Sequence, residues 1–152
     1  MIHYPDTSFL CSLYRDQIHS KNANAERQQM GEALHFTSLL EFEFIQAIEL
    51  QVYLHSQNQN KGYSRNEADQ MIADWESDIA KGINRLVCFD MDAVLRLSKS
   101  LSSHNTARGG HRTLDILHVA TAVHLGARRF LTFDDRQKSL AVHADLQVPP
   151  FH

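Results

Sequence analysis

The sequence predicts an α/β domain whose mostly parallel sheet is covered by helices on both faces. Short apolar segments alternate along the chain with longer segments that have the 3.6-residue period of helices. The 152 residues suit one ordinary domain and show no internal repeat and no linker, so residues 1–152 are expected to form a single domain. Ligands of such sheets bind beyond the carboxyl ends of the strands, which makes the residues after each strand the first candidates for function.

Turn and capping residues separate the elements expected in the first half of the chain. These elements are a strand over 2–4, a helix over 9–14, a helical segment over 23–33, a strand over 34–38, a long helix over 39–54 and a loop over 56–62. The long helical segment has too many apolar positions for a surface helix, so it is not expected to lie on the surface.

The helix that begins after Ser64 has the clearest amphipathic pattern. Ser64 and Glu67 have the spacing of a capping box, and Gly82 is placed to end the helix. Between these ends, five apolar residues share one helix face, which we call the Trp75 stripe: Ala68, Met71, Ile72, Trp75 and Ile79.

The second half of the chain continues the alternation of strands and helices. The expected elements are a strand over 85–89, a helix over 92–101, a loop over 102–111, a helix over 114–125, a strand over 129–133, a helix over 135–144 and an edge strand over 146–148. The segment 114–125 is almost wholly apolar and is closed by Gly126, which favours a buried helix.

The composition excludes several classes of protein. Hydrophobic residues make up 43% of the chain and charged residues 22%, which excludes a disordered tail and a disulfide scaffold. The net charge of −3 excludes nucleic-acid binding through bulk positive charge alone. With no apolar run long enough for a membrane span and no signal-peptide pattern, we expect a cytoplasmic protein without membrane contact. Cys11 and Cys88 lie among apolar neighbours and are expected in the core.

Four carboxylates fall at the predicted carboxyl edge of the sheet. Asp6 follows the first strand, Glu43 lies one turn into the helix after the second, Asp115 is in the first turn of the most apolar helix, and Asp134 follows the fourth strand. Clustered carboxylates repel one another, and a divalent cation is the usual compensation. All-oxygen ligands suit Mg²⁺ or Mn²⁺, so the pattern predicts a metal site. The sequence assigns no role to Glu41.

Simpler interpretations exist for three of these acids. Asp6 could cap the first helix, Asp134 and its neighbour Asp135 could form a cap pair, and Asp115 could interact with its helix dipole. Glu43 is harder to explain in this way, because it shares a helix stripe with apolar residues and should point inward. That stripe contains Ala47, Leu50 and Leu54.

Four segments of the chain resemble a PIN domain, and the resemblance is closest to the VapC-type toxin ribonucleases of prokaryotic toxin–antitoxin pairs. The matching segments are Asp6-Thr7-Ser8, Thr37-Ser38 with Glu43 and Ala47, the block from Arg112 to Ala122, and the closing run from Leu125 to Asp134. The block from Arg112 to Asp134 is the specific part of the pattern.

The resemblance implies a three-layer α/β/α sandwich and RNA cleavage that depends on Mg²⁺ or Mn²⁺. In it, Asp6, Asp115 and Asp134 would hold one or two ions, while Glu43 binds the metal or orients its water. A hydroxyl residue near the first and last acids would support the site, and the matching residues are Ser8 and Thr132. The resemblance also implies a small antitoxin partner and a homodimer, which we expect to form partly through the Trp75 stripe.

RNA would reach an acidic site along a strip of basic residues. The candidate contacts are Arg108, Arg112, Arg136 and Lys138, with Lys99 and His111 in segments expected near the same edge. Scattered Lys and Arg are also ordinary solvated surface residues.

Two other functions remain open. A PIN-like module that binds nucleic acid or protein without cutting would keep the same fold. Asp90 and Asp92 follow an apolar strand, as in haloacid dehalogenase-like phosphatases, but Ala93 and Val94 replace the usual Gly-Thr, so Asp90 is expected to cap a helix. A zinc enzyme and a serine hydrolase are not favoured, because neither H-E-x-x-H nor G-x-S-x-G occurs. His118 is expected to be a core or supporting residue.

Overall fold

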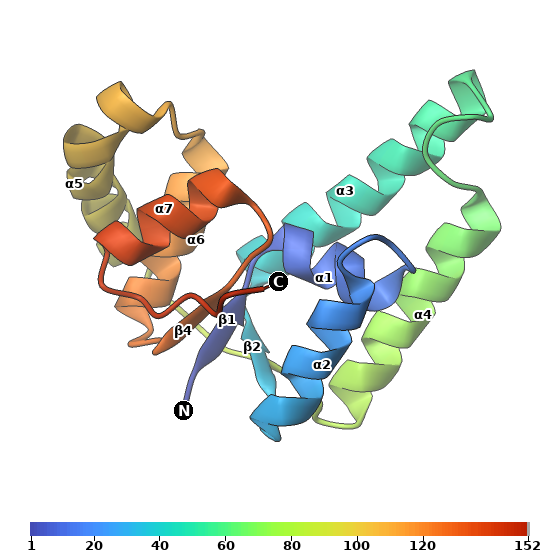
Figure 1. Cartoon of the computed structure of the whole chain (residues 1–152), viewed down its shortest axis with the longest axis horizontal. Coiled ribbons are helices and arrows are strands. Elements are labelled where there is room, and N and C mark those ends of the chain that lie inside the picture. Colours follow the sequence, from blue (N-terminus) through green and yellow to red (C-terminus); the bar gives the residue numbers. More distant parts are fainter. Residues whose placement is uncertain (152) are drawn as a thin grey trace.

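The four strands of the computed structural model, which describes residues 1–151, form two parallel pairs. One pair consists of β1 (His3–Pro5) and β4 (Arg129–Leu131), and the other of β2 (Leu34–Phe36) and β3 (Asn84–Leu86). β1 and β2 lie side by side (Figure 1), so the two pairings place the strands in the order β4, β1, β2, β3. Within each pair the two strands run parallel, as predicted.

Seven helices in the described chain cover the two sides of this small strand layer. They are α1 (Thr7–Tyr14), α2 (Ser20–Met30), α3 (Ser38–Gln57), α4 (Arg65–Ala80), α5 (Met91–Gly109), α6 (Thr113–His124) and α7 (Asp135–His143). In Figure 1, α1 to α4 lie on one side of the strands and α5 to α7 on the other. The arrangement is the expected α/β sandwich. Among residues 1–151, no helix is both long and apolar enough to cross a membrane.

The Trp75 stripe of α4 is part of the core. Ala68, Met71 and Trp75 are buried, and the Trp75 side chain is only 1% exposed. Its ring lies 4.7 Å from that of Phe36, between ring centroids, and its Nε1 donates a hydrogen bond of 2.8 Å to Glu41. The expectation that this stripe forms a dimer interface is therefore wrong, because the stripe already packs inside its own chain. The hydrogen bond gives Glu41 the role that the sequence left open.

The long helix α3 is only partly buried, contrary to the expectation from its composition. Phe44 and Ile48 face the core, whereas Leu50 and Tyr53 are about half exposed or more, at 49% and 58%. The helix extends beyond the strands (Figure 1), so its distal turns have little core to pack against. The prediction that the stripe of Glu43 points inward is therefore wrong for Leu50.

Tertiary packing also changes the boundaries of several expected elements. Residues 102–109 continue α5 instead of forming a loop, because α5 packs along α6 and overrides the weak helix propensity of this polar segment. The helix ends at Gly110, whose φ of 65° is in the left-handed region. β3 ends at Leu86, and Cys88 beyond it is exposed rather than buried. The expected edge strand is a single bridge between Gln147 and Arg129.

Trp75→Ala should lower the free energy of unfolding by about 3–5 kcal/mol, because it opens a cavity beside Phe36 and leaves Glu41 without its donor. Tyr53→Ala, at an exposed position, should change it by less than about 0.5 kcal/mol. Urea unfolding followed by circular dichroism measures both. Equal stability of the Trp75 variant and the unmodified protein would contradict the placement of this stripe in the core.

Candidate active site

Asp6 is the most buried of the four candidate acids. It follows β1 and caps α1, accepting a hydrogen bond of 3.0 Å from the backbone N–H of Phe9. Two hydroxyl groups also donate to its carboxylate, that of Ser8 at 2.6 Å and that of Thr132 at 2.5 Å. The side chain thus does more than cap a helix, since residues from both ends of the chain converge on it. Ser8 and Thr132 both contact the first acid.

Burial raises the pKa of Asp6 to about 6, and the hydrogen bonds from Ser8, Thr132 and Phe9 only partly offset this rise. Because its pKa is raised in this way, the ionised form of Asp6 is destabilised at physiological pH. A nearby cation would favour the charged form and lower the pKa again.

Glu43 lies in the second turn of α3 and faces α6. Its carboxylate accepts a hydrogen bond of 2.6 Å from the Thr7 hydroxyl and pairs at 2.6 Å with Nε2 of His118. His118 is fully buried, and its Nδ1 lies 3.3 Å from the Tyr4 hydroxyl. Burial raises the pKa of Glu43, but the hydrogen bond and charge of His118 and the bond from Thr7 outweigh it, so the pKa is lowered overall. Glu43 is thereby fixed as a carboxylate.

Asp134 caps α7 at the end of the strand that carries Thr132. Its carboxylate accepts hydrogen bonds from the backbone N–H groups of Arg136 and Gln137, at 2.8 and 3.1 Å. Its own backbone N–H donates to the Thr132 hydroxyl at 3.0 Å, and this hydroxyl in turn donates to Asp6. The predicted cap role of Asp134 is confirmed, and Thr132 links Asp134 to Asp6.

Asp115, in the first turn of α6, joins the same network. The side-chain amide of Gln137 donates to its Oδ1 at 3.4 Å, and Arg112 donates to its Oδ2 at 3.3 Å. Hydrogen bonds therefore connect Asp115 through Gln137 to Asp134 and through Thr132 to Asp6. Three of the four acids share this network, and Glu43 is attached to its end through Thr7, the residue after Asp6.

The donor set fits a hard divalent cation in chemical type. Within residues 1–151, no three His, Cys, Asp or Glu side chains lie close enough together to hold an ion by themselves. Mg²⁺ does not need such a cage, because it keeps several waters and is usually bound through one or two carboxylates and substrate phosphates. The carboxylate and hydroxyl oxygens around Asp6 are of the required kind, and the raised pKa of Asp6 is what a cation would relieve.

The candidate basic residues lie on several surfaces rather than one strip. Arg112 is 74% exposed and pairs with Asp115, and Lys138 lines a cavity together with Asp134. Arg136 is exposed in the first turn of α7. Arg108 and His111 line a different cavity, near the end of α5, and Lys99 a third between α5 and α6. Of these candidates, Arg112, Arg136 and Lys138 are the ones that lie beside the acids.

Three residues of the network were not singled out from the sequence: Thr7, Gln137 and Tyr4. The signals were local in two cases. Thr7 directly follows Asp6, and Gln137 stands three residues after the capping Asp134, where a side chain can turn back across the helix start. His118, expected as a core or supporting residue, is fully buried and stands three residues after Asp115 on the same helix.

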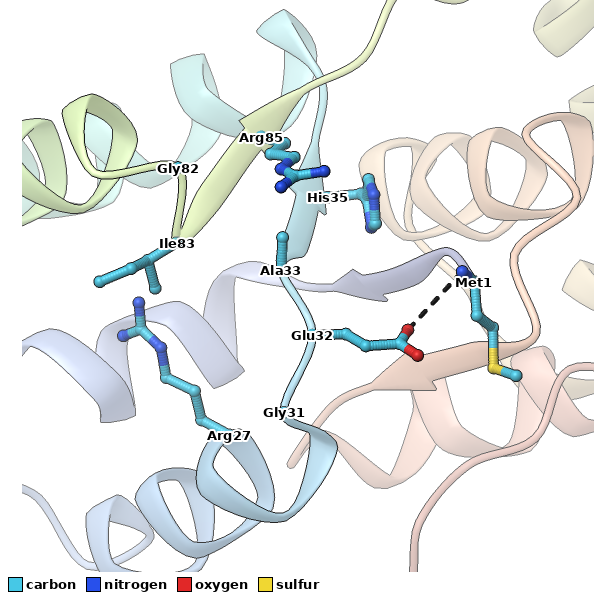
Figure 2. Close-up of a pocket in the computed structure, with 9 residues that line it drawn as sticks. All are labelled: Met1, Arg27, Gly31, Glu32, Ala33, His35, Gly82, Ile83 and Arg85. Atoms are coloured by element: carbon cyan, nitrogen blue, oxygen red, sulfur yellow. Dashed lines mark ion pairs between the residues drawn. The ribbon is translucent and has the colours of Figure 1, made fainter.

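Another cavity, of about 580 Å³, lies at the opposite edge of the strands, where β2 and β3 begin. Figure 2 shows Arg27, His35 and Arg85 around it, together with the ion pair between the Met1 amino group and Glu32 at 3.6 Å. None of the four candidate acids lines this cavity, so it is separate from the site described above.

Comparison with known protein families gives one match. The family model of the PIN domain matches residues 3–142, a span that contains all four acids and both hydroxyl residues around Asp6. Among curated proteins, none matches the chain.

Asp6→Asn should stabilise the protein at pH 7.5 and lose this advantage as the pH falls toward 4. The folded pKa of Asp6 is about 6 against an ordinary value of 3.8, so the folded state binds the proton more tightly, and stability from this group declines as pH rises through that interval. Asn has no charge to bury, and its amide suits the same hydroxyl groups. The expected gain is about 1–3 kcal/mol. Melting temperatures at pH 7.5 and 4.5, with exposed Asp90→Asn as control, measure it; a less stable Asp6→Asn at both pH values would refute the burial argument.

Proposed function

Because the chain belongs to the PIN domain family, whose members are generally nucleases, we propose that it is an endoribonuclease that depends on Mg²⁺ or Mn²⁺ and hydrolyses phosphodiester bonds of RNA. The hydrogen-bond network that joins Asp115, Asp134 and Asp6, with Glu43 beside it, is the observation that carries this proposal. Such a concentration of carboxylates at the carboxyl edge of parallel strands suits cation-assisted chemistry on a phosphate.

The four acids have two tasks in this proposal. Asp6, Asp115 and Asp134 provide the negative charge that binds one or two cations, and Ser8 and Thr132 hold Asp6 in position. A bound divalent ion would activate a water molecule and neutralise charge on the phosphate. Glu43 is kept ionised by His118 and Thr7, so it can accept a hydrogen bond from the attacking water and orient it.

The charge balance of the site also bears on how RNA binds. Four carboxylates repel a polyanion, and only cations can reverse the sign of this edge. Arg112, although paired with Asp115, is exposed enough to turn toward a phosphate, and Arg136 and Lys138 stand on the first turns of α7. RNA is therefore expected to bind weakly when divalent ions are removed.

We further propose that the protein is a cytoplasmic VapC-type toxin with a small antitoxin and a homodimeric state. This part rests on the sequence resemblance and on a cavity of about 430 Å³ in which Glu43 and Asp115 are flanked by the apolar side chains of Leu50 and Leu114. A partner segment that combines an arginine with apolar residues would fit this chemistry, since bidentate Arg suits carboxylates.

A PIN-like module that binds without cutting is the second candidate. It is favoured by one observation, namely that every one of the four carboxylates already accepts hydrogen bonds from its own chain. The phosphatase hypothesis has less support: Asp90 is exposed and accepts a hydrogen bond of 3.1 Å from the backbone of Ala93, the expected role of a helix cap.

Asp6→Asn and Asp115→Asn should each reduce RNA cleavage by at least about a hundred-fold, because each removes a charged oxygen ligand while keeping the side-chain volume. Asp90→Asn is the matched control and should cleave RNA as the unmodified protein does. Turnover of total RNA and of a labelled oligonucleotide, with Mg²⁺, Mn²⁺ or excess EDTA, measures the effect. A phosphatase would instead hydrolyse a phosphomonoester, losing activity in Asp90→Asn and keeping it in Asp6→Asn. Cleavage of RNA that persists in EDTA would refute the metal dependence.

The partner proposal has its own test. Expression together with the product of any small open reading frame beside the gene should give a complex that purifies intact and no longer cleaves RNA. Glu43→Gln combined with Asp115→Asn should weaken that complex, because it removes the charges that an arginine would contact. A protein that purifies as a strict monomer and binds no neighbouring gene product would rule out both the antitoxin and the homodimer.

A further inference from the structure

A row of aromatic rings leads from the core to the surface beside Asp134. The ring of Phe133 is nearly parallel to that of buried Phe9, at 12° and 5.6 Å between centroids. It is also nearly parallel to the ring of His19, at 6° and 4.5 Å. Phe133 is half-buried and His19 is exposed, so the row ends in a flat ring at the surface.

The position of His19 is not explained by the helix that it begins. His19 occupies the N-cap of α2, yet its side chain makes no capping hydrogen bond. Asn, Asp, Ser or Thr would serve better at this position if capping were the only requirement. The imidazole instead lies against Phe133, which belongs to the segment between β4 and α7.

This stack borders a cavity that shares its wall with the acid network. The cavity measures about 260 Å³ and is lined by His19, Thr132, Phe133, Asp134, Lys138 and Phe151, among others. Thr132 and Asp134 are the two residues through which the network reaches Asp6. A group that occupies the cavity is thus a direct neighbour of the proposed reaction centre.

We infer that this cavity receives the base of a nucleotide adjacent to the cleaved bond, with the exposed ring of His19, which stacks on Phe133, as its platform. The inference rests on the proposed ribonuclease function. Drug-sized ligands usually need a pocket of about 300–1,000 Å³, so a cavity of this size suits a single flat group. The cavity adjoins the acid network, so a base in it would belong to a nucleotide next to the reacting phosphate. Aromatic rings hold unpaired bases by stacking.

The charged residues around the cavity set the direction of the bound nucleotide. Lys138 provides a cation for the flanking phosphate, while the carboxylate of Asp135 repels phosphate and can accept a hydrogen bond from an exocyclic amino group of a base. The base would therefore lie against the ring of His19, with its phosphates toward Lys138 and the cations that the acids would hold.

The test combines variants of the protein with variants of the RNA. His19→Ala removes the exposed ring, His19→Phe keeps a flat ring, and His104→Ala makes the same chemical change at an exposed position on α5. The RNA is an oligonucleotide with one mapped cleavage site, made intact and with an abasic ribose at each flanking position in turn. Cleavage efficiency is measured with Mg²⁺, RNA binding is measured by fluorescence anisotropy with Ca²⁺ in place of Mg²⁺, and melting temperatures confirm folding.

His19→Ala should reduce cleavage and binding of intact RNA by about ten-fold or more, whereas His19→Phe and His104→Ala should stay near the unmodified protein. On the RNA that lacks the docked base, His19→Ala should cause no further loss. Equal cleavage by His19→Ala, or losses that multiply at every abasic position, would overturn the subsite while the nuclease proposal stands. His19-dependent binding without any cleavage would overturn the nuclease proposal alone, and absence of both binding and cleavage would overturn both.

Discussion

The burial of one carboxylate, that of Asp6, is the constraint on which the rest of this structure depends. The parallel pairing of β1 with β4 brings the end of the first strand next to the end of the last, so that Thr132 can donate to Asp6. Ser8 adds a second hydroxyl donor from the first turn of α1. These bonds keep a buried acid in place but do not neutralise it, and its pKa is raised to about 6. The carboxylate of Asp6 is fixed in position but destabilised as an anion by its burial, and a bound cation would stabilise it.

The other three acids lie at the same carboxyl edge of the strands but have different hydrogen-bond partners. Glu43 is held in the ionised form by His118, whereas Asp134 and Asp115 are connected through the backbone and side chain of Gln137. Neighbouring carboxylates thus have different environments, which is the usual way in which one fold separates charge binding from proton handling. The strands are very short, and the candidate site residues lie after them or in the helices.

Much of this arrangement could be predicted from the sequence, because the signals were local. Capping residues indicated where α1, α4 and α7 begin, and two of these caps are the candidate acids Asp6 and Asp134. The polar end of α5 and the exposed turns of α3 could not be predicted, since both depend on what a helix packs against rather than on its own residues. The same limit applies to the ring of His19, whose partner Phe133 comes from a segment distant in sequence.

A calorimetric titration with Mn²⁺ tests most directly whether the acid edge is a cation site. It is carried out at pH 6.5 in two buffers with different ionisation enthalpies, so that proton release can be separated from binding. A cation site at Asp6 predicts saturable binding with release of protons from the unmodified protein, because the cation displaces the proton that Asp6 retains near its raised pKa. It also predicts much weaker binding, without that proton release, for Asp6→Asn. Identical titrations of the two proteins, or no binding by either, would contradict it.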